Sequence, residues 1–263
     1  MISNRTQLFR FMAALMVAPA LAQGAPLYPN SVVSNDLEFI TTKDASVFAC
    51  MAYDGTTRAE MPDKRNDELF VDGVHQFALK FQDGTAVTAF VHPKIGPKSS
   101  AQKYVSKVAK PLGRLPTFMR ARLGHVIIHK GDETAFSEDE GRFFVLYSRN
   151  IDKRIKTHDL EETIFHETVH ATLDVPHAKS RAWRKAARAD GDFVTGYAAR
   201  NPDGEDMAES ALFAWAVLTH PGRLPDNVET KVRQVMPHRL AFFKDLFPAK
   251  DRIFQRVGPK PDC

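Results

Sequence analysis

The sequence predicts an α+β fold in which a strand-rich N-terminal lobe precedes a helical C-terminal lobe. Short apolar runs separated by Asp-Gly pairs dominate residues 46–92, whereas helical periodicity dominates after residue 157. Of the 263 residues, 43% are hydrophobic and 26% are charged, which is ordinary for a globular protein and argues against disorder. A chain of this length can bury a sizeable core.

The first 22 residues have the pattern of a secretory signal peptide. Arg5 and Arg10 give a positive start, and residues 11–18 form an apolar run that is too short to span a bilayer. Ala20-Leu21-Ala22 then supplies small residues before a cleavage site at Gln23. The alternative is a single N-terminal membrane anchor, which the short apolar run disfavours. We therefore expect an exported protein, periplasmic or secreted, with no stable membrane span after cleavage.

Charge and cysteine content limit the possible partners and compartments. Without residues 1–22 the chain has 34 basic and 32 acidic residues, so its net charge gives no support for a nucleic-acid partner. Cys50 and Cys263 are the only cysteines. In an oxidising compartment they can form one disulfide, and the alternative is two unpaired thiols. The sequence leaves both possibilities open.

The first part of the chain, residues 23–99, is predicted to be a strand-rich segment. Residues 23–45 are expected to form an extended, loosely structured lead-in. Strands are expected at 47–51, 77–81 and 86–91, separated by Asp-Gly turns. Asp83-Gly84 between the last two runs is a good hairpin signal.

Residues 100–263 are predicted to form a second domain. A helix over 100–110 should be capped by Ser100 and stopped by Pro111. Strands are expected at 126–128 and 143–147, and the acidic stretch between them is expected to be a solvated turn.

Helices then follow to the end of the chain. The expected helices are 159–173, with Asp159 and Glu162 as a capping box, 180–190, one starting at Asp203, and 226–247 with a kink at Pro237.

His166-Glu167-Thr168-Val169-His170 is the motif that points to chemistry. On a helix, residues four apart lie one above the other, so both imidazoles face one point. Two neutral imidazoles suit Zn²⁺, and Glu167 can act as a general base beside the metal. The alternative is a chance match, which is expected in about one chain in a hundred of this length at average residue frequencies.

A third metal ligand is expected from Glu205. Glu205 and Glu209 are one turn apart at the start of a predicted helix, so Glu205 can complete a His₂Glu site while Glu209 accepts the outer N–H of a ligating histidine. The alternative is that both acids only favour the helix dipole. His177 is a rival ligand, but Leu173 stands where a ligand so close to His170 would need a glycine turn.

The motif, followed by residues 197–202 and then Glu205-Asp206-Met207-Ala208-Glu209, resembles the gluzincin peptidases. The resemblance is greatest to the catalytic domain of anthrax-toxin lethal factor, and it covers residues 100–247. It implies a zincin-like metallopeptidase domain, Glu205 as the third zinc ligand, and a Tyr197 hydroxyl that helps to hold the oxyanion. The interval from Tyr197 to Glu205 is about one residue longer than in lethal factor, and a loop-anchoring role is the alternative for Tyr197.

These observations predict an exported zinc metallopeptidase that hydrolyses protein or peptide substrates. Zn²⁺ is the expected cofactor, with His166, His170 and Glu205 as ligands and Glu167 as the base. The alternative function is an envelope binding protein that zinc stabilises without catalysis. Structural zinc sites usually have four protein ligands and prefer cysteine, which the motif lacks.

Overall fold

The structure is a computed structural model that describes residues 25–263. The described chain is a mixed α/β protein, as predicted, and it contains a six-stranded sheet with strands from both sides of residue 99. The predicted signal peptide, residues 1–22, lies outside the described residues. The strands are β1 (Phe48–Glu60), β2 (Phe70–Phe81), β3 (Ala86–Val91), β4 (His125–His129), β5 (Phe136–Glu138) and β6 (Phe143–Tyr147).

The sheet is mixed, with the strand order β1-β2-β3-β4-β6-β5. β1, β2 and β3 are antiparallel, whereas β3, β4 and β6 are parallel. β5 runs antiparallel to β6 at the edge, where Phe136 pairs with Val145. The expectation of a solvated turn over this acidic stretch is therefore wrong. A three-residue strand with a single apolar side chain has too little alternation to be recognised in a sequence.

Asp-Gly pairs have two different roles in the sheet. Gly55 in β1 and Gly73 in β2 have φ angles of 99° and 71°, which glycine adopts without steric cost. The β1–β2 register shifts next to each of them, so they form bulges inside two long strands rather than the expected turns. Asp83-Gly84 does form the predicted turn between β2 and β3.

Helices and short helical turns occupy much of the remaining chain. No helix within residues 25–263 has both the length and the apolar sequence that crossing a bilayer requires. The helices are α1 (Lys98–Arg114), α2 (Thr117–Arg120), α3 (Ser148–Lys156), α4 (Leu160–Leu173), α5 (Arg181–Asp190), α6 (Gly196–Arg200), α7 (Asp206–Thr219), α8 (Asp226–Val235) and α9 (Pro237–Leu246). The short turns are η1 (Val32–Ser34), η2 (Pro93–Ile95), η3 (Asp174–Ala178) and η4 (Lys250–Arg252).

Several helix boundaries differ from those predicted. α1 continues through Pro111, because the missing N–H of a proline near the helix end removes only one backbone hydrogen bond. The start of α7 at Asp206 is later than the expected Asp203, and α3 was not expected. Pro237 divides the last predicted helix into α8 and α9, since a proline is well accommodated in a first helical turn. The predicted helix over 180–190 is confirmed as α5.

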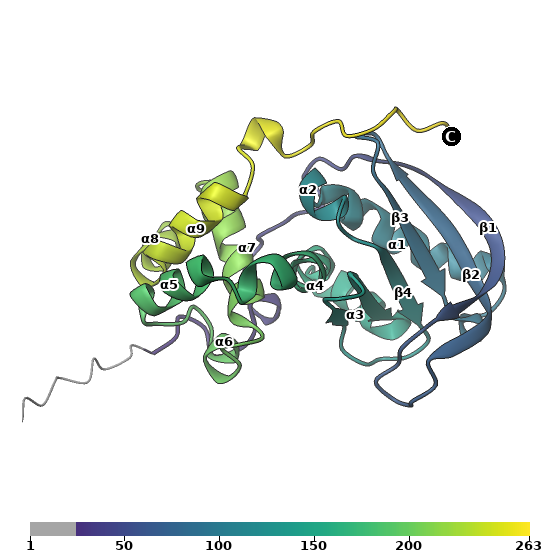
Figure 1. The fold of residues 1–263 in the computed structure, drawn as a ribbon, viewed down its shortest axis with the longest axis horizontal. Helices are drawn as coiled ribbons and strands as arrows, with labels where there is room; N and C mark the ends of the chain where they lie inside the picture. Colours follow the sequence, from purple (N-terminus) through teal and green to yellow (C-terminus); the bar gives the residue numbers. More distant parts are fainter. Residues whose placement is uncertain (1–24) are drawn as a thin grey trace, which may run out of the picture.

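Helices α1 and α4 pack on one face of the sheet, and α4 also packs against α7. Figure 1 shows α4 between the sheet and the group of helices α5 to α9. Alternate side chains of the strands point to opposite faces: Phe144 and Leu146 of β6 enter the main core, whereas Val145 and Tyr147 belong to a smaller cluster on the other face. The helix that carries the histidine motif therefore lies at the centre of the molecule.

The N-terminal segment, defined here as residues 25–45, is not the loose lead-in that its composition suggests. Val32, Val33, Phe39 and Ile40 are buried in the main core. Tyr28 forms a β-bridge with Thr195 in the helical part. These contacts join residues far apart in the sequence and follow no helical or strand period, which explains why the sequence does not reveal them.

The start of α4 also differs from the predicted capping box. The Asp159 side chain makes no cap bond and instead forms an ion pair with Arg154. Glu162 Oε1 accepts the backbone N–H groups of Phe39 and Ile40, at 3.2 and 3.1 Å. The Glu162 carboxylate thus accepts hydrogen bonds from the N-terminal segment and not from the backbone of Asp159, as a capping box would require.

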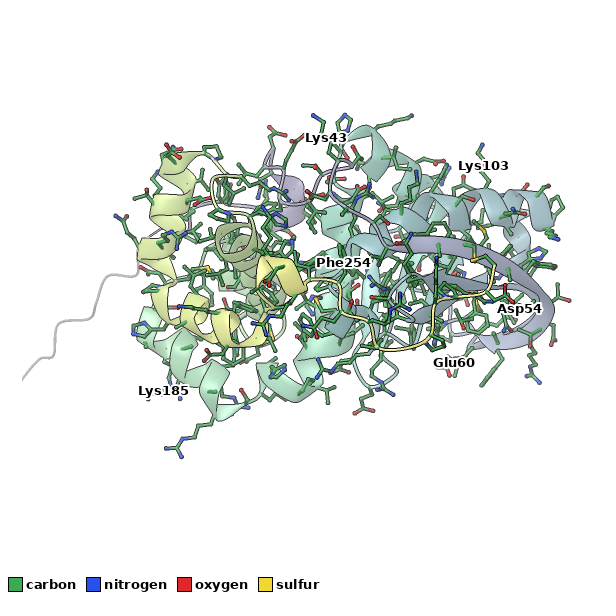
Figure 2. The ribbon with its side chains drawn as sticks, turned by 90° about the horizontal axis from the view of Figure 1, so that it is seen from above. Lys43, Asp54, Glu60, Lys103, Lys185 and Phe254 are labelled. Carbon is green, nitrogen blue, oxygen red and sulfur yellow. A yellow bond between two sulfur atoms is a disulfide. The ribbon has the colours of Figure 1, made fainter. Side chains whose placement is uncertain are left out.

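The C-terminal segment, defined here as residues 248–263, crosses from the helical part back to the sheet (Figures 1 and 2). Val257 N–H donates to the Asp83 carbonyl oxygen, and a Cβ on Gly84 would lie 2.5 Å from the Gly258 backbone. Cys263 forms a disulfide with Cys50 on β1. The structure thus supports the paired alternative for the two cysteines, and the bond closes a loop across 213 residues.

Candidate metal centre

α4 carries the histidine motif on a helix that is buried along most of its length. The ring centroids of His166 and His170 are 4.8 Å apart, as expected for residues one helical turn apart. His166, Glu167 and their helical neighbours are buried because α4 packs between the sheet, α1 and α7. Buried polar side chains need partners, so their surroundings decide what they do.

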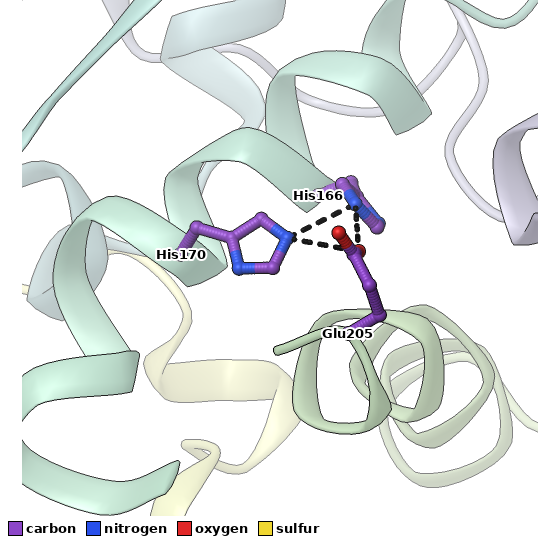
Figure 3. A group of neighbouring side chains, drawn as sticks. All are labelled: His166, His170 and Glu205. Atoms are coloured by element: carbon purple, nitrogen blue, oxygen red, sulfur yellow. Dashed lines mark hydrogen bonds and ion pairs between the residues drawn. The ribbon is translucent and has the colours of Figure 1, made fainter. Parts of the chain in front are cut away.

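Glu205 reaches the two histidines from the residue that precedes α7. Its Oε2 lies 3.3 Å from His170 Nε2 and 3.4 Å from His166 Nε2 (Figure 3). The two Nε2 atoms are themselves 3.2 Å apart. A backbone hydrogen bond from Glu205 N–H to the Asn201 carbonyl oxygen orders the loop that delivers this carboxylate.

These three separations fit a metal ion. Zinc binds imidazole nitrogen and carboxylate oxygen at about 2.0–2.2 Å in tetrahedral geometry, which places neighbouring ligand atoms about 3.3–3.6 Å apart. The observed separations of 3.2, 3.3 and 3.4 Å agree with the edges of such a tetrahedron. Within residues 25–263, His166, His170 and Glu205 are the only group of three or more such side chains close enough to share an ion.

The charges in this group also suit a cation. Burial opposes ionisation of Glu205, but hydrogen bonds from His166 and His170 hold its pKa well below the usual range. Burial alone would lower the pKa of His170, but its hydrogen bonds to Asp174 and Glu205 raise it well above the usual value. The buried carboxylate is thus stabilised by positive charge, which a divalent cation supplies when it displaces the proton.

Each histidine turns its second ring nitrogen toward a carboxylate. His170 Nδ1 lies 2.7 Å from Asp174 Oδ2, and His166 Nδ1 lies 3.7 Å from Glu209 Oε1. A hydrogen bond such as the one between His170 and Asp174 fixes the tautomer and aims the opposite nitrogen at a metal, whereas the 3.7 Å between His166 and Glu209 is too long for such a bond. Glu209 lies beside His166 but makes no hydrogen bond to it, so its role as acceptor of the outer N–H stays a prediction. The contact of Asp174 with His170 was not predicted, although the spacing of four residues between them was a signal of contact.

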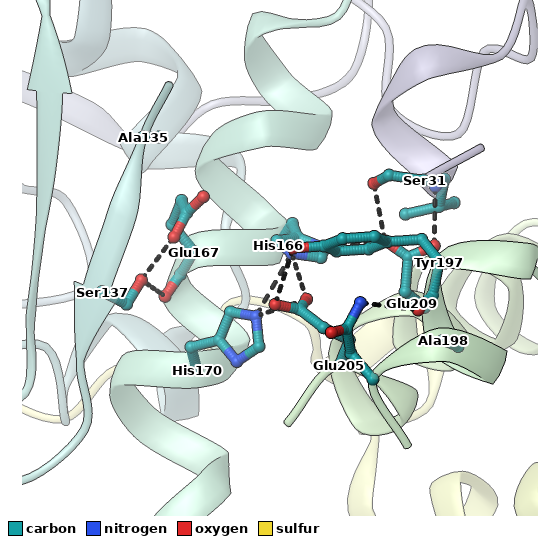
Figure 4. Close-up of polar contacts among 12 residues, drawn as sticks. Ser31, Ala135, Ser137, His166, Glu167, His170, Tyr197, Ala198, Glu205 and Glu209 are labelled. Carbon is teal, nitrogen blue, oxygen red and sulfur yellow. Dashed lines mark hydrogen bonds and ion pairs between the residues drawn. The ribbon is translucent and has the colours of Figure 1, made fainter. Parts of the chain in front are cut away.

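Glu167 belongs to the same site but not to the ligand group. Its Oε2 lies 2.6 Å from Ser137 Oγ on the edge strand β5, and its backbone oxygen lies 2.8 Å from the same hydroxyl (Figure 4). Ser137 can donate to only one of them at a time. This contact was not predicted, because nothing in the local sequence links two residues that are 30 positions apart. It holds one carboxylate oxygen and leaves Oε1 available.

Tyr197 lies beside the third candidate ligand. Its hydroxyl donates to Glu205 Oε1 at 3.0 Å (Figure 4). Burial, followed by the charge of Glu205, raises the pKa of Tyr197 to about 12. The hydroxyl therefore keeps its proton at neutral pH and acts as a hydrogen-bond donor.

A cavity of about 360 Å³ connects these groups. Its walls come from the edge-strand region on one side and from α4, α6 and the start of α7 on the other. The lining includes the candidate ligands together with Lys64, Phe136, Ser137, Glu167, Asp174 and Tyr197. Three larger cavities, of about 480, 500 and 750 Å³, lie elsewhere, and none of them is lined by a member of the candidate ligand group.

Comparison of the chain with models of protein families, with curated proteins and with solved structures found no match. The interpretation of the site therefore depends on its own geometry.

The structure does not bring His177 to this group. His177 is in η3, where its ring packs against Phe242 with centroids 5.9 Å apart. η3 is a π-helical turn that continues α4, so the chain does not reverse after His170 as a ligand at this position would require. Glu205 is the third candidate ligand that the fold brings to the two histidines.

Replacing Asp174 should weaken metal binding without removing a candidate ligand. We expect Asp174→Ala to lower zinc affinity about ten- to a hundredfold, because His170 loses the carboxylate that orients its ring. Competition with a coloured chelator measures this change. Asp203→Ala is the charge-matched control, since Asp203 is exposed and makes no ion pair or hydrogen bond within residues 25–263. Equal affinities of the two variants would contradict the orienting role.

Proposed function

We propose that this protein is an exported, zinc-dependent peptidase with a zincin-like catalytic domain of the gluzincin type. The observation that carries the proposal is the arrangement of four side chains around one cavity. His166, His170 and Glu205 are spaced as ligands of one tetrahedral ion, and Glu167 lies beside them without joining the ligand group. A Glu side chain between two such histidines is the general base expected for metal-assisted hydrolysis.

The candidate ligands favour a catalytic zinc site over a structural zinc site. Two imidazoles and one carboxylate form a ligand combination found in catalytic zinc sites, whereas structural sites usually fill four positions and prefer cysteine. Among residues 25–263 no fourth histidine, cysteine or acidic side chain joins the group. Both cysteines are paired with each other and lie outside the cavity. An ion held here would keep a position open toward the cavity.

The protein's own residues then supply proton transfer and positioning. Bound Zn²⁺ would polarise a substrate carbonyl and lower the pKa of water to about 7. Glu167 would take the proton of the attacking water and deliver it to the departing amine nitrogen. Ser137 would hold one Glu167 oxygen so that the other faces the cavity. Tyr197, which keeps its proton, would donate a hydrogen bond to the developing oxyanion after leaving Glu205.

The edge strand β5 favours an extended peptide as the substrate. β5 pairs with β6 on one side and is the last strand of the sheet within residues 25–263, so no described strand covers its other side. Ala135, Phe136 and Ser137 line the cavity beside the candidate metal ligands. An extended peptide can add to such an edge through main-chain hydrogen bonds, which would place its carbonyl groups along the cavity.

An unbiased peptide library tests this function. We expect the zinc-loaded protein to cleave internal peptide bonds, the chelator-stripped protein to cleave none, and added zinc to restore cleavage. Mass spectrometry of the products identifies the cut sites. If the protein binds zinc tightly but cleaves no peptide, the alternative of a zinc-stabilised envelope binding protein replaces the peptidase proposal.

A further inference from the structure

The N-terminal segment reaches the candidate metal centre through Glu209. Ser31 Oγ donates to Glu209 Oε1 at 2.6 Å, and Val32 N–H donates to Oε2 at 2.7 Å. Thr195 Oγ donates to Oε2 at 2.6 Å. The Glu209 side chain is 0% exposed. Figure 4 shows Ser31 above this carboxylate.

The two oxygens of Glu209 have different surroundings. Oε2 is held by two donors, the Val32 N–H and the Thr195 hydroxyl. Oε1 accepts from Ser31 and also faces His166 Nδ1 at 3.7 Å. His166 Nδ1 is buried and has no hydrogen-bond partner within the described residues. The oxygen that can fix this histidine is therefore the one that Ser31 holds.

We propose that Ser31 is a positioning residue and that the N-terminal segment completes the metal centre. This inference rests on the proposed metal site and deepens it. Oε2 stays held by its two donors when Ser31 is removed, but Oε1 loses the hydroxyl that holds it. Oε1 is the oxygen that faces His166 Nδ1 at 3.7 Å and can set the tautomer and ring angle of this histidine. Because Ser31 holds Oε1 directly, it acts on His166 through Glu209 without touching the metal.

The segment is anchored on α4, which carries both histidines, and on α7, which Glu205 directly precedes. Ser31 and Val32 bind Glu209 on α7, and eight residues later Phe39 and Ile40 donate to Glu162 on α4. Glu162 lies one helical turn before His166. The two ligand-bearing helices are thus joined by a segment from the start of the described chain, which the predicted cleavage before Gln23 would leave on the mature protein. This connection adds to the direct packing of α4 against α7 in holding the histidines and Glu205 relative to one another.

Three variants of the full chain test the role of Ser31. We expect Ser31→Ala to weaken zinc binding about tenfold, the lower end of the loss that follows removal of an outer partner. Ser31→Thr keeps the hydroxyl and should bind zinc as the unmodified protein does. Ser34→Ala is the matched control, because Ser34 is exposed in the same segment and its side chain makes no hydrogen bond within residues 25–263. The visible spectrum of the Co²⁺ form should change in Ser31→Ala alone.

A double-mutant cycle separates positioning from general destabilisation. In a Glu209→Ala background, Ser31→Ala should cause no further loss of zinc affinity, because its only route to His166 is already gone. A full tenfold loss in that background, or unchanged zinc affinity in the single variant, would overturn the inference. Thermal unfolding of the metal-free variants accompanies these titrations, and lower stability with unchanged zinc affinity would mark Ser31 as merely structural.

The outcome is independent of peptide cleavage. If Ser31→Ala weakens zinc binding while no peptide is cleaved, the positioning role stands and the peptidase proposal fails. If zinc binding and cleavage are both observed but neither depends on Ser31, the inference fails alone. If the unmodified protein binds no zinc, both are wrong.

Discussion

Glu167→Gln is expected to abolish most peptide cleavage while leaving zinc bound. The amide cannot accept a proton from water, and general-base catalysis typically contributes on the order of 10²–10⁴-fold to a rate. Zinc affinity should be nearly unchanged, because Glu167 is outside the candidate ligand group. Gln has the same shape and its oxygen can still accept from Ser137, so the fold around β5 should be retained. Cleavage rates and zinc content of the two proteins give the comparison.

A matched acidic residue provides the control for this experiment. Glu140 is exposed in the loop after β5 and does not line the cavity. Glu140→Gln removes the same charge and should keep the cleavage rate. Comparable cleavage by Glu167→Gln would refute the mechanism, and loss of zinc from that variant would mean that Glu167 is a ligand.

The sequence predicts those contacts of the site whose two residues lie close together in the chain. His166, Glu167 and His170 share one helix, where the four-residue spacing alone sets their relative positions. Glu205 lies on another element, but a metal with two histidines needs a third ligand, and few acidic residues follow the motif at a helix start. The Glu205–Glu209 pair was therefore visible in the sequence, although the distances were not.

The residues that sequence reasoning missed act through long-range contacts. Ser137 is on a strand too short to show alternation, and it meets Glu167 only because β5 lies beside α4 in the fold. Ser31 is 178 residues from Glu209 in the sequence, in a segment whose proline and polar content suggested a loose lead-in. Asp174 is the exception, because it is one turn from His170 and could have been found by spacing alone.

The fold shows the same division. Strong local signals gave the Asp83-Gly84 hairpin, the capped helix α5 and the strands β4 and β6. The Asp-Gly pairs at Gly55 and Gly73 led to a wrong prediction of turns, because a glycine with positive φ occurs in bulges as well as in turns. Which of the two forms depends on pairing with the neighbouring strand, which the local sequence does not show. Pro237 likewise begins a new helix instead of kinking an old one, since Met236 leaves the helical conformation.

Glu205→Ala and His177→Ala together decide the identity of the third ligand. Glu205→Ala removes an oxygen that lies 3.3 and 3.4 Å from the two imidazole nitrogens. Loss of a residue that only hydrogen-bonds a ligand lowers metal affinity by up to about a hundredfold, so loss of the ligand itself should lower zinc affinity further. His177→Ala removes a ring that packs on Phe242, away from the cavity, and should leave zinc affinity nearly unchanged. Glu205 makes no cap bond to α7, so its removal takes no hydrogen bond from that helix. Zinc titration of both variants, with circular dichroism to verify folding, gives the answer. If His177→Ala strips the metal while Glu205→Ala retains it, the gluzincin-type assignment is wrong.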